Sequence, residues 1–205
     1  MAINFLELKN FNLQHGIIHI PMELPWSSPG FVNVYFIEEK DGYVMIDCGV
    51  NGSEYQELLE TKMTSFGLSY ENIKLLIGTH MHSDHIGLSS TLREKDIPFA
   101  LYKNSVEFIE GYNDWSIRFK KLKEYAKKEG APKSFLDDID QIETPIYAGK
   151  ISKPDVLLEE GNIKNVNRNI EIIFTPGHDR TEISILDNPS QILFSGDHIL
   201  PKITP

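Results

Sequence analysis

Thr79-His80-Met81-His82-Ser83-Asp84-His85 is the stretch of this sequence on which its fold and its chemistry depend. Three of the seven histidines of the chain lie between positions 80 and 85, together with one carboxylate. The stretch follows the apolar run Ile73 to Ile77 and precedes Ile86-Gly87. The pattern therefore predicts a strand, a loop and then the start of a helix.

The spacing of the histidines indicates a metal site. His80 and His82 are two positions apart, so on an extended backbone both imidazoles project to the same side. Asp84 and His85 follow where the chain turns and can approach the same space from another direction. Imidazole together with carboxylate suits zinc, iron or manganese. The alternative is a polar loop in which Asp84 caps the next helix, but that leaves three clustered imidazoles unexplained.

Two later segments each consist of an apolar strand followed by a turn, and each can supply one more metal ligand to those of the first motif. Ile172-Ile173-Phe174 is an apolar strand that leads through Thr175-Pro176-Gly177 to His178. Ile192-Leu193-Phe194 leads through Ser195-Gly196 to Asp197. A ligand that follows a strand and a small-residue turn is held in place by a rigid scaffold.

These motifs together resemble the metallo-β-lactamase superfamily, and the resemblance runs from about Phe31 to Pro205. The matching segments are His80-Met81-His82-Ser83-Asp84-His85, Thr175-Pro176-Gly177-His178, Ser195-Gly196-Asp197 and Ile46-Asp47-Cys48-Gly49. Within the superfamily, Asn33-Val34-Tyr35 and the tail Gly196 to Pro201 look most like the glyoxalase-II-like hydrolases.

The resemblance implies a ligand set. The family residues that match His80, His82 and His178 hold one metal, and those that match Asp84 and His85 hold a second. The counterpart of Asp197 bridges the two ions, and that of Asp47 steadies the ligand loop from behind. The implied fold is α/β, an αββα sandwich of two mixed sheets flanked by helices. Zinc is the expected cofactor, one or two ions, with iron or manganese as alternatives.

The chain departs from the family pattern at two places. Glu182 stands near a position where many relatives carry a second histidine. The chain also has no histidine after His198, where family members supply one more ligand. We therefore expect residues 1–205 to be a single metallo-β-lactamase-like domain that is shortened at its C-terminus. The alternative is a second metal site that is weak or completed by water.

The composition restricts the class of partner. The 30 acidic and 20 basic residues give a net charge of −10, which would repel nucleic acid. The single Cys48 allows no intrachain disulfide and fits a reducing compartment. The sequence shows neither a signal peptide nor an apolar stretch of membrane-spanning length. We expect a cytoplasmic protein that acts on a small molecule and binds no membrane.

The remaining local patterns predict strands and one helix in the first half. Asp41-Gly42 marks a tight hairpin turn, and Ser53 is the predicted cap of a helix that reaches Phe66 and is ended by Gly67. A helix to about Lys95 should follow the metal motif. The predicted strands are Ile17 to Ile20, Asn33 to Ile37, Tyr43 to Ile46, Ile73 to Ile77 and Phe99 to Tyr102.

A helical insertion is predicted near residues 105–142. Its aromatic and apolar side chains recur at spacings of three and four and form one stripe: Phe108, Tyr112, Trp115, Phe119 and Leu122. We expect the stripe to pack against the domain or against a second copy of the chain, and Phe119 to line the substrate pocket. The lysines Lys120, Lys121, Lys123, Lys127 and Lys128 read as a solvated helix face rather than a basic patch.

Five further residues have two possible roles each. Trp26, in the proline-rich loop Pro21 to Gly30, could cover the metals or anchor the loop to the core. His198 could contact substrate or be structural, and should point away from Asp197 on an extended chain. Cys48 is a packing residue or a thiol near the metals. His19, like His15, lies outside every motif and is expected to be a surface or core residue.

The expected function is metal-dependent hydrolysis of an ester, thioester or lactone. A metal-activated hydroxide would attack the carbonyl, and Asp84 would orient it and handle protons. One alternative is an iron-dependent dioxygenase that acts on persulfides on the same scaffold. Another is a non-catalytic metal-binding member, since folds of this kind host inactive relatives.

Overall fold

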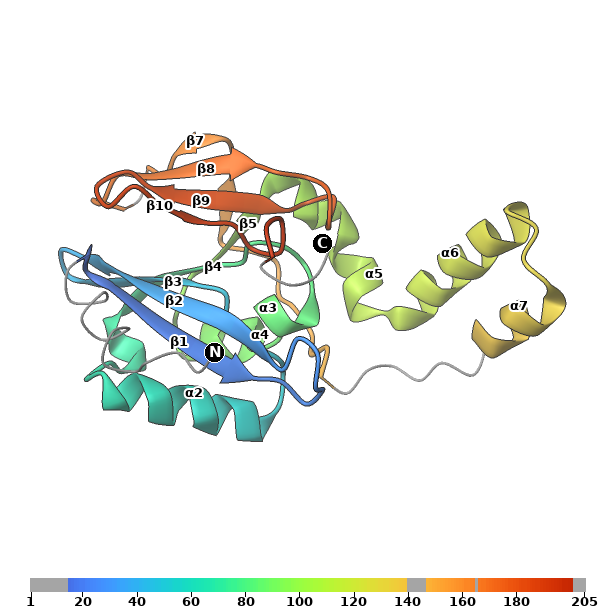
Figure 1. The fold of residues 1–205 in the computed structure, drawn as a ribbon, viewed down its shortest axis with the longest axis horizontal. Coiled ribbons are helices and arrows are strands. Elements are labelled where there is room, and N and C mark those ends of the chain that lie inside the picture. The colour runs from blue at the N-terminus through green and yellow to red at the C-terminus, as the bar shows by residue number, and fades with distance from the viewer. Residues whose placement is uncertain (1–14, 140–146, 165, 201–205) are drawn as a thin grey trace.

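Two β-sheets face each other in the computed structural model, which describes residues 15–139, 147–164 and 166–200 (Figure 1). The larger sheet has the strand order β1-β2-β3-β4-β5-β6. The pairs β1–β2 and β2–β3 are antiparallel, whereas β3, β4, β5 and β6 run parallel. The strands are β1 (Ile17–Glu23), β2 (Phe31–Glu39), β3 (Gly42–Ile46), β4 (Ile73–Ile77), β5 (Phe99–Tyr102) and β6 (Val156–Leu158).

The smaller sheet has the order β10-β9-β8-β7, and its described strands pair antiparallel. Its strands are β7 (Gly161–Asn162), β8 (Ile170–Phe174), β9 (Ile183–Asp187) and β10 (Ile192–Phe194). Buried residues of both sheets, such as Ile46, Ile77 and Ile185, form one core cluster between them. The predicted α/β fold of two facing sheets flanked by helices is confirmed, with one correction: only the larger sheet is mixed, because the described strands of the smaller sheet are all antiparallel.

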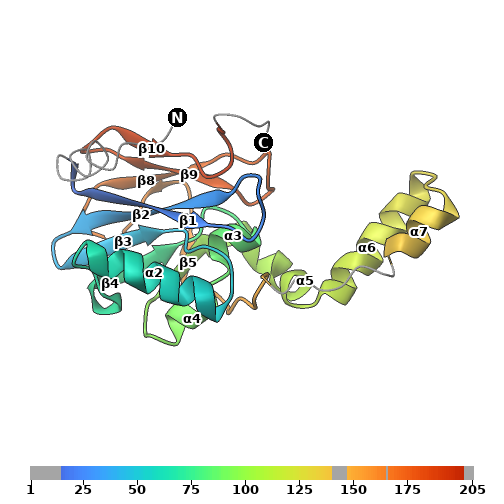
Figure 2. The same ribbon diagram turned by 60° about the horizontal axis from the view of Figure 1, so that its bottom comes forward.

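Helices cover the outer face of the larger sheet (Figure 2). They are α2 (Ser53–Ser65), α3 (Ser83–Ile86) and α4 (Ser89–Arg93), with a 3-10 turn η1 (Tyr70–Asn72) before β4. Leu59 of α2 and Leu92 of α4 belong to a second core cluster with strand residues such as Phe36. The two core clusters hold the larger sheet between them, so its strand ends are rigid supports for a site.

Four local predictions need correction. Gly52, not Ser53, is the N-cap of α2, and no side chain caps it. The segment after the metal motif forms two short helices instead of one that reaches Lys95. His82, not Asp84, is the N-cap of α3, and Asp84 lies in the first turn. Strand β1 also continues to Glu23, because the pairing with β2 extends to Glu23 and Phe31.

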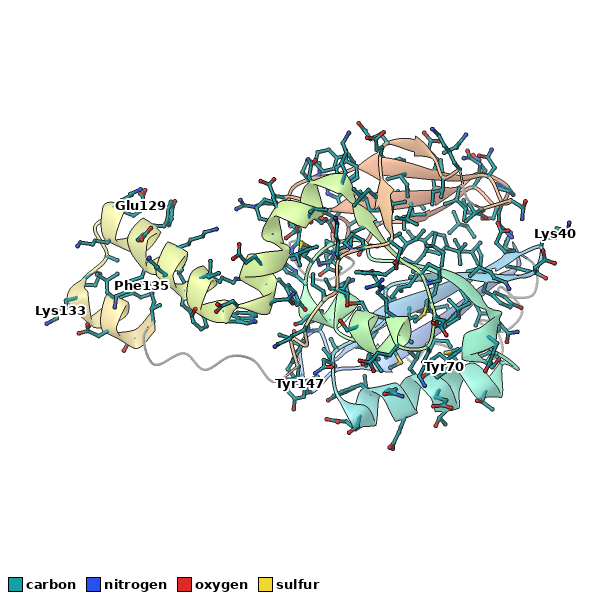
Figure 3. All side chains as sticks on the ribbon, turned by 180° about the vertical axis from the view of Figure 1, so that it is seen from behind. Lys40, Tyr70, Glu129, Lys133, Phe135 and Tyr147 are labelled. Atoms are coloured by element: carbon teal, nitrogen blue, oxygen red, sulfur yellow. The ribbon has the colours of Figure 1, made fainter. Side chains whose placement is uncertain are left out.

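The helical insertion forms an arm that extends away from the sheets (Figures 1 and 3). It consists of a 3-10 segment η2 (Lys103–Phe108) and the helices α5 (Ile109–Asn113), α6 (Trp115–Lys128) and α7 (Lys133–Ile139). The predicted continuous stripe is wrong, because Asp114 has an extended backbone and its carboxylate accepts from the amide of Ser116, which starts a new helix. Residues 140–142 of the predicted insertion lie outside the described residues.

Within the described part of the chain, no helix combines the length and the apolar character that crossing a membrane requires.

Candidate metal centre

The ligand loop leaves the end of β4 and is fixed to both sheets. The carbonyl of Thr79 accepts from the amide of Ile183, the first residue of β9, at 2.9 Å. Asp47 follows β3, which is parallel to β4, so both strands deliver their next residues to the same edge. The amide of Thr79 accordingly donates to Oδ1 of Asp47 at 2.8 Å. Residues 32 positions apart thus meet at one sheet edge.

Three histidines converge in a first group: His80, His82 and His178. Nδ1 of His82 lies 3.0 Å from Nε2 of His80 and 2.9 Å from Nε2 of His178. A ring nitrogen donates one hydrogen or accepts one, so these two close contacts cannot both be ordinary hydrogen bonds. Ligands 2.0–2.1 Å from a tetrahedral zinc ion have nitrogens about 3.3 Å apart. The convergence therefore fits a cation between the rings.

A second group joins His80, His85 and Asp197. Nε2 of His85 lies 3.3 Å from Oδ1 of Asp197. The other oxygen, Oδ2, lies 3.5 Å from Nε2 of His178, which belongs to the first group. Asp197 thus touches both groups, as a bridging carboxylate would, and the donor set fits the dinuclear metal site of the superfamily that the sequence resembles.

Asp84 lies at the margin of the second group. Its Oδ2 atom is 3.8 Å from Nε2 of His85. The structure places it beside the second group, outside the two sets whose ligand atoms all lie within 4.8 Å of one another. Its side chain is 18% exposed, so it can meet both the ligands and a molecule that enters from solvent.

Asp47 orients the second group from behind. Its Oδ2 atom lies 2.6 Å from Nδ1 of His85, and the hydroxyl of Thr79 donates to the same oxygen at 2.9 Å. The Thr79 hydroxyl also lies 3.0 Å from Nδ1 of His80. A carboxylate on the far ring nitrogen fixes the tautomer and the orientation of a ligand histidine. Thr79, whose role no sequence motif predicts, links Asp47 to both ligand groups.

Burial and charge set the protonation of the histidines. Burial, and then the neighbouring imidazoles of His85, His82 and His178, hold the pKa of His80 well below its ordinary value. Burial would also lower the pKa of His85, but Asp47 and Asp197 outweigh it and raise that pKa well above the ordinary value. His80 is therefore neutral, the form that ligates a metal.

Glu182, which stands near the position where many relatives carry a second histidine, supports the metal centre from behind, as Thr79 does. Its side chain is fully buried, and Oε1 accepts from the amide of Asp197 at 2.8 Å. Oε1 also lies 3.9 Å from Nδ1 of His80, while Oε2 has no hydrogen-bond partner among the described residues. Burial raises the pKa of this carboxyl. Gly196 allows the close approach: a Cβ there would lie 3.0 Å from Oε1 of Glu182, at φ +53°.

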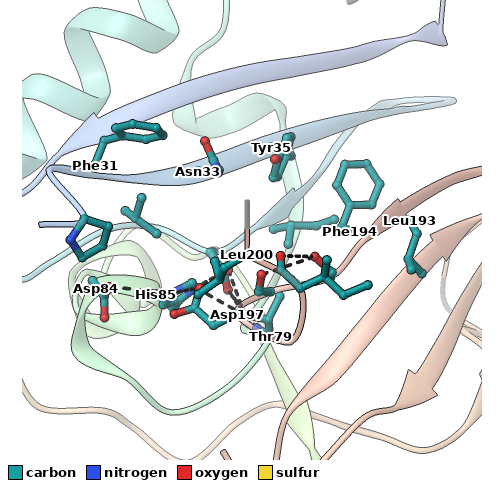
Figure 4. A pocket seen from close by; sticks show the side chains of 17 residues that line it. Phe31, Asn33, Tyr35, Thr79, Asp84, His85, Leu193, Phe194, Asp197 and Leu200 are labelled. Atoms are coloured by element: carbon teal, nitrogen blue, oxygen red, sulfur yellow. Dashed lines mark hydrogen bonds and ion pairs between the residues drawn. The ribbon is translucent and has the colours of Figure 1, made fainter. Parts of the chain in front are cut away.

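A cavity of about 270 Å³ opens on the side of Asp84, His85 and Asp197 (Figure 4). Its opposite wall is strand β2, from which Asn33 and Tyr35 face the cavity. Burial, and then the charge of Asp47, raise the pKa of Tyr35 to about 12, so its phenol is neutral. The second group is thus reached through a small pocket of mixed polarity.

A larger cavity of about 690 Å³ opens on the side of His82 and His178. One wall is the β8–β9 turn from Pro176 to Thr181, and the other comes from η2, α5 and α6. Tyr112, whose hydroxyl donates to the carbonyl of Ala148 at 2.5 Å, lies in this second wall. The helical arm therefore contributes to a pocket beside the first metal group.

The structure places the three predicted substrate contacts outside both cavity linings. Trp26 packs edge-on to Tyr147, with ring centroids 6.3 Å apart, and against the core under the larger sheet. Phe119 packs against Trp115. The exposed His198 ring lies close to Gly177 of the Pro-Gly-His turn. Tyr112 and Phe108 line the larger cavity instead. Which aromatic side chains line the cavity depends on how α5 and α6 are placed, and no local pattern predicts that placement.

Cys48 lies beneath the ligand loop and is fully buried. Its thiol donates to the carbonyl of His85 at 3.3 Å. Burial, and then the charge of Asp47, raise the pKa of this thiol well above its ordinary value. Cys48 is therefore a protonated packing residue under the loop.

Comparison with known proteins identifies the same family as the sequence motifs do. A profile described as the metallo-beta-lactamase superfamily matches residues 27–205. The chain is 28% identical over 172 residues to the probable metallo-hydrolase YflN of Bacillus subtilis, covering 82% of this chain and 61% of that protein. It is 23% identical over 200 residues to the human acyl-coenzyme A thioesterase MBLAC2, covering 91% and 64%. The chain thus spans about six tenths of the length of these curated relatives.

A solved structure supports the fold. The metallo-beta-lactamase family protein TTHA1429 from Thermus thermophilus superposes with a TM-score of 0.73 at 20% identity. The superposition covers 93% of this chain and 62% of that structure.

Proposed function

This chain belongs to the metallo-β-lactamase superfamily, and from that premise we propose that it is a metal-dependent hydrolase of an ester, thioester or lactone. The observation that carries the proposal is the position of Asp197, whose two oxygens lie 3.3 Å from His85 and 3.5 Å from His178. Two ligand groups that share a carboxylate fit a metal pair, and metal pairs of this kind serve hydrolysis.

The proposed ligands come from the two groups, with the addition of Asp84, which lies beside the second group and which the resemblance assigns to the second ion. His80, His82 and His178 would hold the first ion, and His85 with Asp84 the second, with Asp197 between them. Zinc is the proposed metal, because nitrogen-rich sites with one or two carboxylates suit it. Such ions supply Lewis acidity, which acidifies water and polarises a carbonyl group.

Asp84 is the proposed general base and acid. Like Asp197, it is partly exposed and lines the smaller cavity, but Asp197 contacts both ligand groups, which leaves Asp84 as the carboxylate proposed for proton transfer. Its carboxylate would accept the proton of the attacking water and deliver it to the leaving group. A positioned group of this kind contributes roughly two to four orders of magnitude in rate.

A thioester is the substrate type with the most support. One relative is named an acyl-coenzyme A thioesterase, and others are named metallo-hydrolases. The glyoxalase-II-like branch, whose tail and β2 motif the sequence resembles, is part of this proposal. A small-molecule substrate and a cytoplasmic setting complete it, the latter because the single cysteine is a buried free thiol.

A panel of substrates tests the proposal. Protein loaded separately with zinc, manganese or iron would be offered an ester, a thioester and a lactone, with oxygen uptake followed in parallel. Hydrolysis by the zinc or manganese form is the expected result. Oxygen consumption with a persulfide by the iron form alone would favour the dioxygenase, and a metal-loaded protein without turnover would indicate a non-catalytic member.

A further inference from the structure

The larger cavity beside the first metal group has a charge pattern that the proposed chemistry does not use. It meets the metal centre through His82 and His178. Its rim carries three cationic side chains that come from different parts of the chain: Arg118 and Lys121 from α6, and Arg180 from the β8–β9 turn. The chain as a whole has a net charge of −10, so this gathering of cations runs against its overall balance.

The three cations remain available to a ligand. In the part of the chain that the structure describes, none of them forms an ion pair with a carboxylate, although both arginines make ring contacts. The Arg118 guanidinium lies 4.7 Å from the centre of the Trp115 ring, and that of Arg180 lies 5.1 Å from the Phe108 ring. Stacking holds a guanidinium by its face and leaves the donors on its edge free.

The carboxylates of the lining do not cancel this charge. Asp179 lies between Arg180 and His178 in sequence, but its Oδ1 atom accepts from the amide of Thr181 at 2.7 Å and from its hydroxyl at 2.6 Å. Its direction is therefore set by its own turn. Glu107, the other carboxylate of the lining, is exposed on the opposite wall. Three cations and two carboxylates leave an excess of positive charge in the cavity.

We infer that this cavity binds an anionic group of the substrate, a carboxylate or a phosphate, at a distance from the carbonyl that is cleaved. The inference rests on the proposed hydrolase function, since it names the substrate class of the same site. The apolar walls, which include Phe108 and Tyr112, would hold the chain that joins the anion to the carbonyl. The inference gives Lys121 a part in a ligand site, although its side chain is exposed on the helix face that was predicted to be solvated.

Binding of uncleavable analogues tests the inference without turnover. Metal-loaded protein would be titrated calorimetrically with two matched pairs: the S-ethyl thioethers of 4′-phosphopantetheine and pantetheine, and 3-(ethylthio)propionate and its amide. Three exposed contacts of this kind should favour at least one anionic member roughly tenfold over its neutral partner. The preference should weaken as salt is added, because salt screens exposed charges. A preference within the first pair would identify a phosphate site, and a preference within the second pair would identify a carboxylate site.

Charge variants decide whether these residues are responsible. The triple variant Arg118→Gln, Lys121→Gln, Arg180→Gln should lose the preference for the anion. The matched control Lys120→Gln, Lys127→Gln, Lys128→Gln removes the same charge from α6, at positions that do not line the cavity. The control should keep the preference. Equal binding of both members of each pair by the unmodified protein, or equal losses in the two triple variants, would overturn the inference.

Kinetics on the corresponding acetyl thioesters separate the two proposals. The triple variant should raise KM for the anionic thioester roughly tenfold with kcat unchanged, and leave the neutral thioester unaffected. Hydrolysis without any difference between anionic and neutral thioesters would overturn the anion site and leave the hydrolase standing. Binding of the anionic thioether without hydrolysis of any thioester, ester or lactone would support the anion site and count against the hydrolase.

Discussion

Oδ2 of Asp47 lies 2.6 Å from Nδ1 of His85, although the two residues are 38 positions apart. This contact directs the other ring nitrogen, Nε2, towards Asp197 at 3.3 Å. The second ligand group therefore depends on a carboxylate that is not itself a ligand, and that holds the loop through Thr79 as well.

Asp47→Ala should weaken the second metal. Without the carboxylate, the His85 ring loses the partner that fixes its tautomer and orientation, and losses of this kind cost roughly 10- to 100-fold in metal affinity. Stepwise removal by a chelator, followed by elemental analysis, would measure it. Asp155→Ala is the control, because that carboxylate pairs with Arg93 elsewhere on the protein. Equal loss of both metals would mean that the loop collapses.

His82→Ala should remove the first metal. Nδ1 of His82 lies within 3.0 Å of both other nitrogens of its group, so its loss removes one of three converging ligand atoms. We expect the metal content per chain to fall clearly by plasma emission, and His19→Ala to leave it unchanged, because His19 bonds to Asn33 instead. We also expect the second metal to be released by a chelator before the first. Unchanged stoichiometry in His82→Ala would show the ligand assignment to be wrong.

Glu182 should support binding of the second metal through the oxygen that accepts from the amide of Asp197. Its Oε1 atom is the partner of the Asp197 amide, which is partly buried, and a fully buried amide without an acceptor costs roughly 1–3 kcal/mol. Glu182→Ala should therefore lower the affinity for the second metal, whereas Glu182→Gln, which keeps an oxygen at that place, should stay near the unmodified protein. The two variants would be compared by chelator titration. If the glutamine variant loses as much as the alanine variant, the charge of Glu182 matters and not the hydrogen bond.

Asp84→Asn should separate catalysis from binding of the first metal. The asparagine keeps the size and one oxygen but loses the charge and the basicity. The first metal should remain, because its three histidines are untouched, and turnover of the substrate should fall by roughly two to four orders of magnitude. Metal content and rate would be measured on the same preparation. A near-normal rate with the first metal in place would reduce Asp84 to a residue of the first turn of α3.

The ion pair of Asp187 and Arg168 should make the folding stability of the protein depend on pH in the acidic range. Burial would raise the pKa of Asp187, but the contacts with Arg168 and Ser190 outweigh it and lower the pKa below its ordinary value. As the pH falls, the carboxyl of Asp187 is therefore protonated in the unfolded chain before it is protonated in the folded protein. The stabilisation is fully present above the ordinary aspartate pKa of about 3.9 and is lost as the pH falls through the lower folded value.

Denaturant unfolding at pH 7 and at about pH 3 tests this dependence. Arg168→Met should cost roughly 3–5 kcal/mol at pH 7, because Asp187 is fully buried and would lose the partner 2.6 Å away. The cost should shrink near pH 3, where the unpaired carboxyl takes up a proton. Lys103→Met, which breaks an exposed pair with Glu159, is the control and should leave the stability close to that of the unmodified protein at either pH. A cost that is independent of pH would contradict the assignment.

Local sequence determined the elements that depend on local interactions. The strand from Ile73 to Ile77 has the predicted bounds, as does the strand from Phe99 to Tyr102. Gly67, with φ +75°, follows the end of α2 as expected. Periodicity and backbone preference act over a few residues, so they can be read from the chain alone. The stripe prediction was wrong because Asp114, a strong N-cap, outweighed the apolar spacing.

Sequence also named the residues of the metal centre, through the motifs and the resemblance that they carry. Only the tertiary structure decided how these residues meet. Asp197 reaches His85 and His178 because two sheets bring strand ends together that are far apart in the chain. The same holds for Glu182 beneath His80, and for Arg180 across the cavity from Arg118 and Lys121. Such contacts arise from the burial of two core clusters at once, and the side chains on the cavity walls carry no local signal of the partner that they will face.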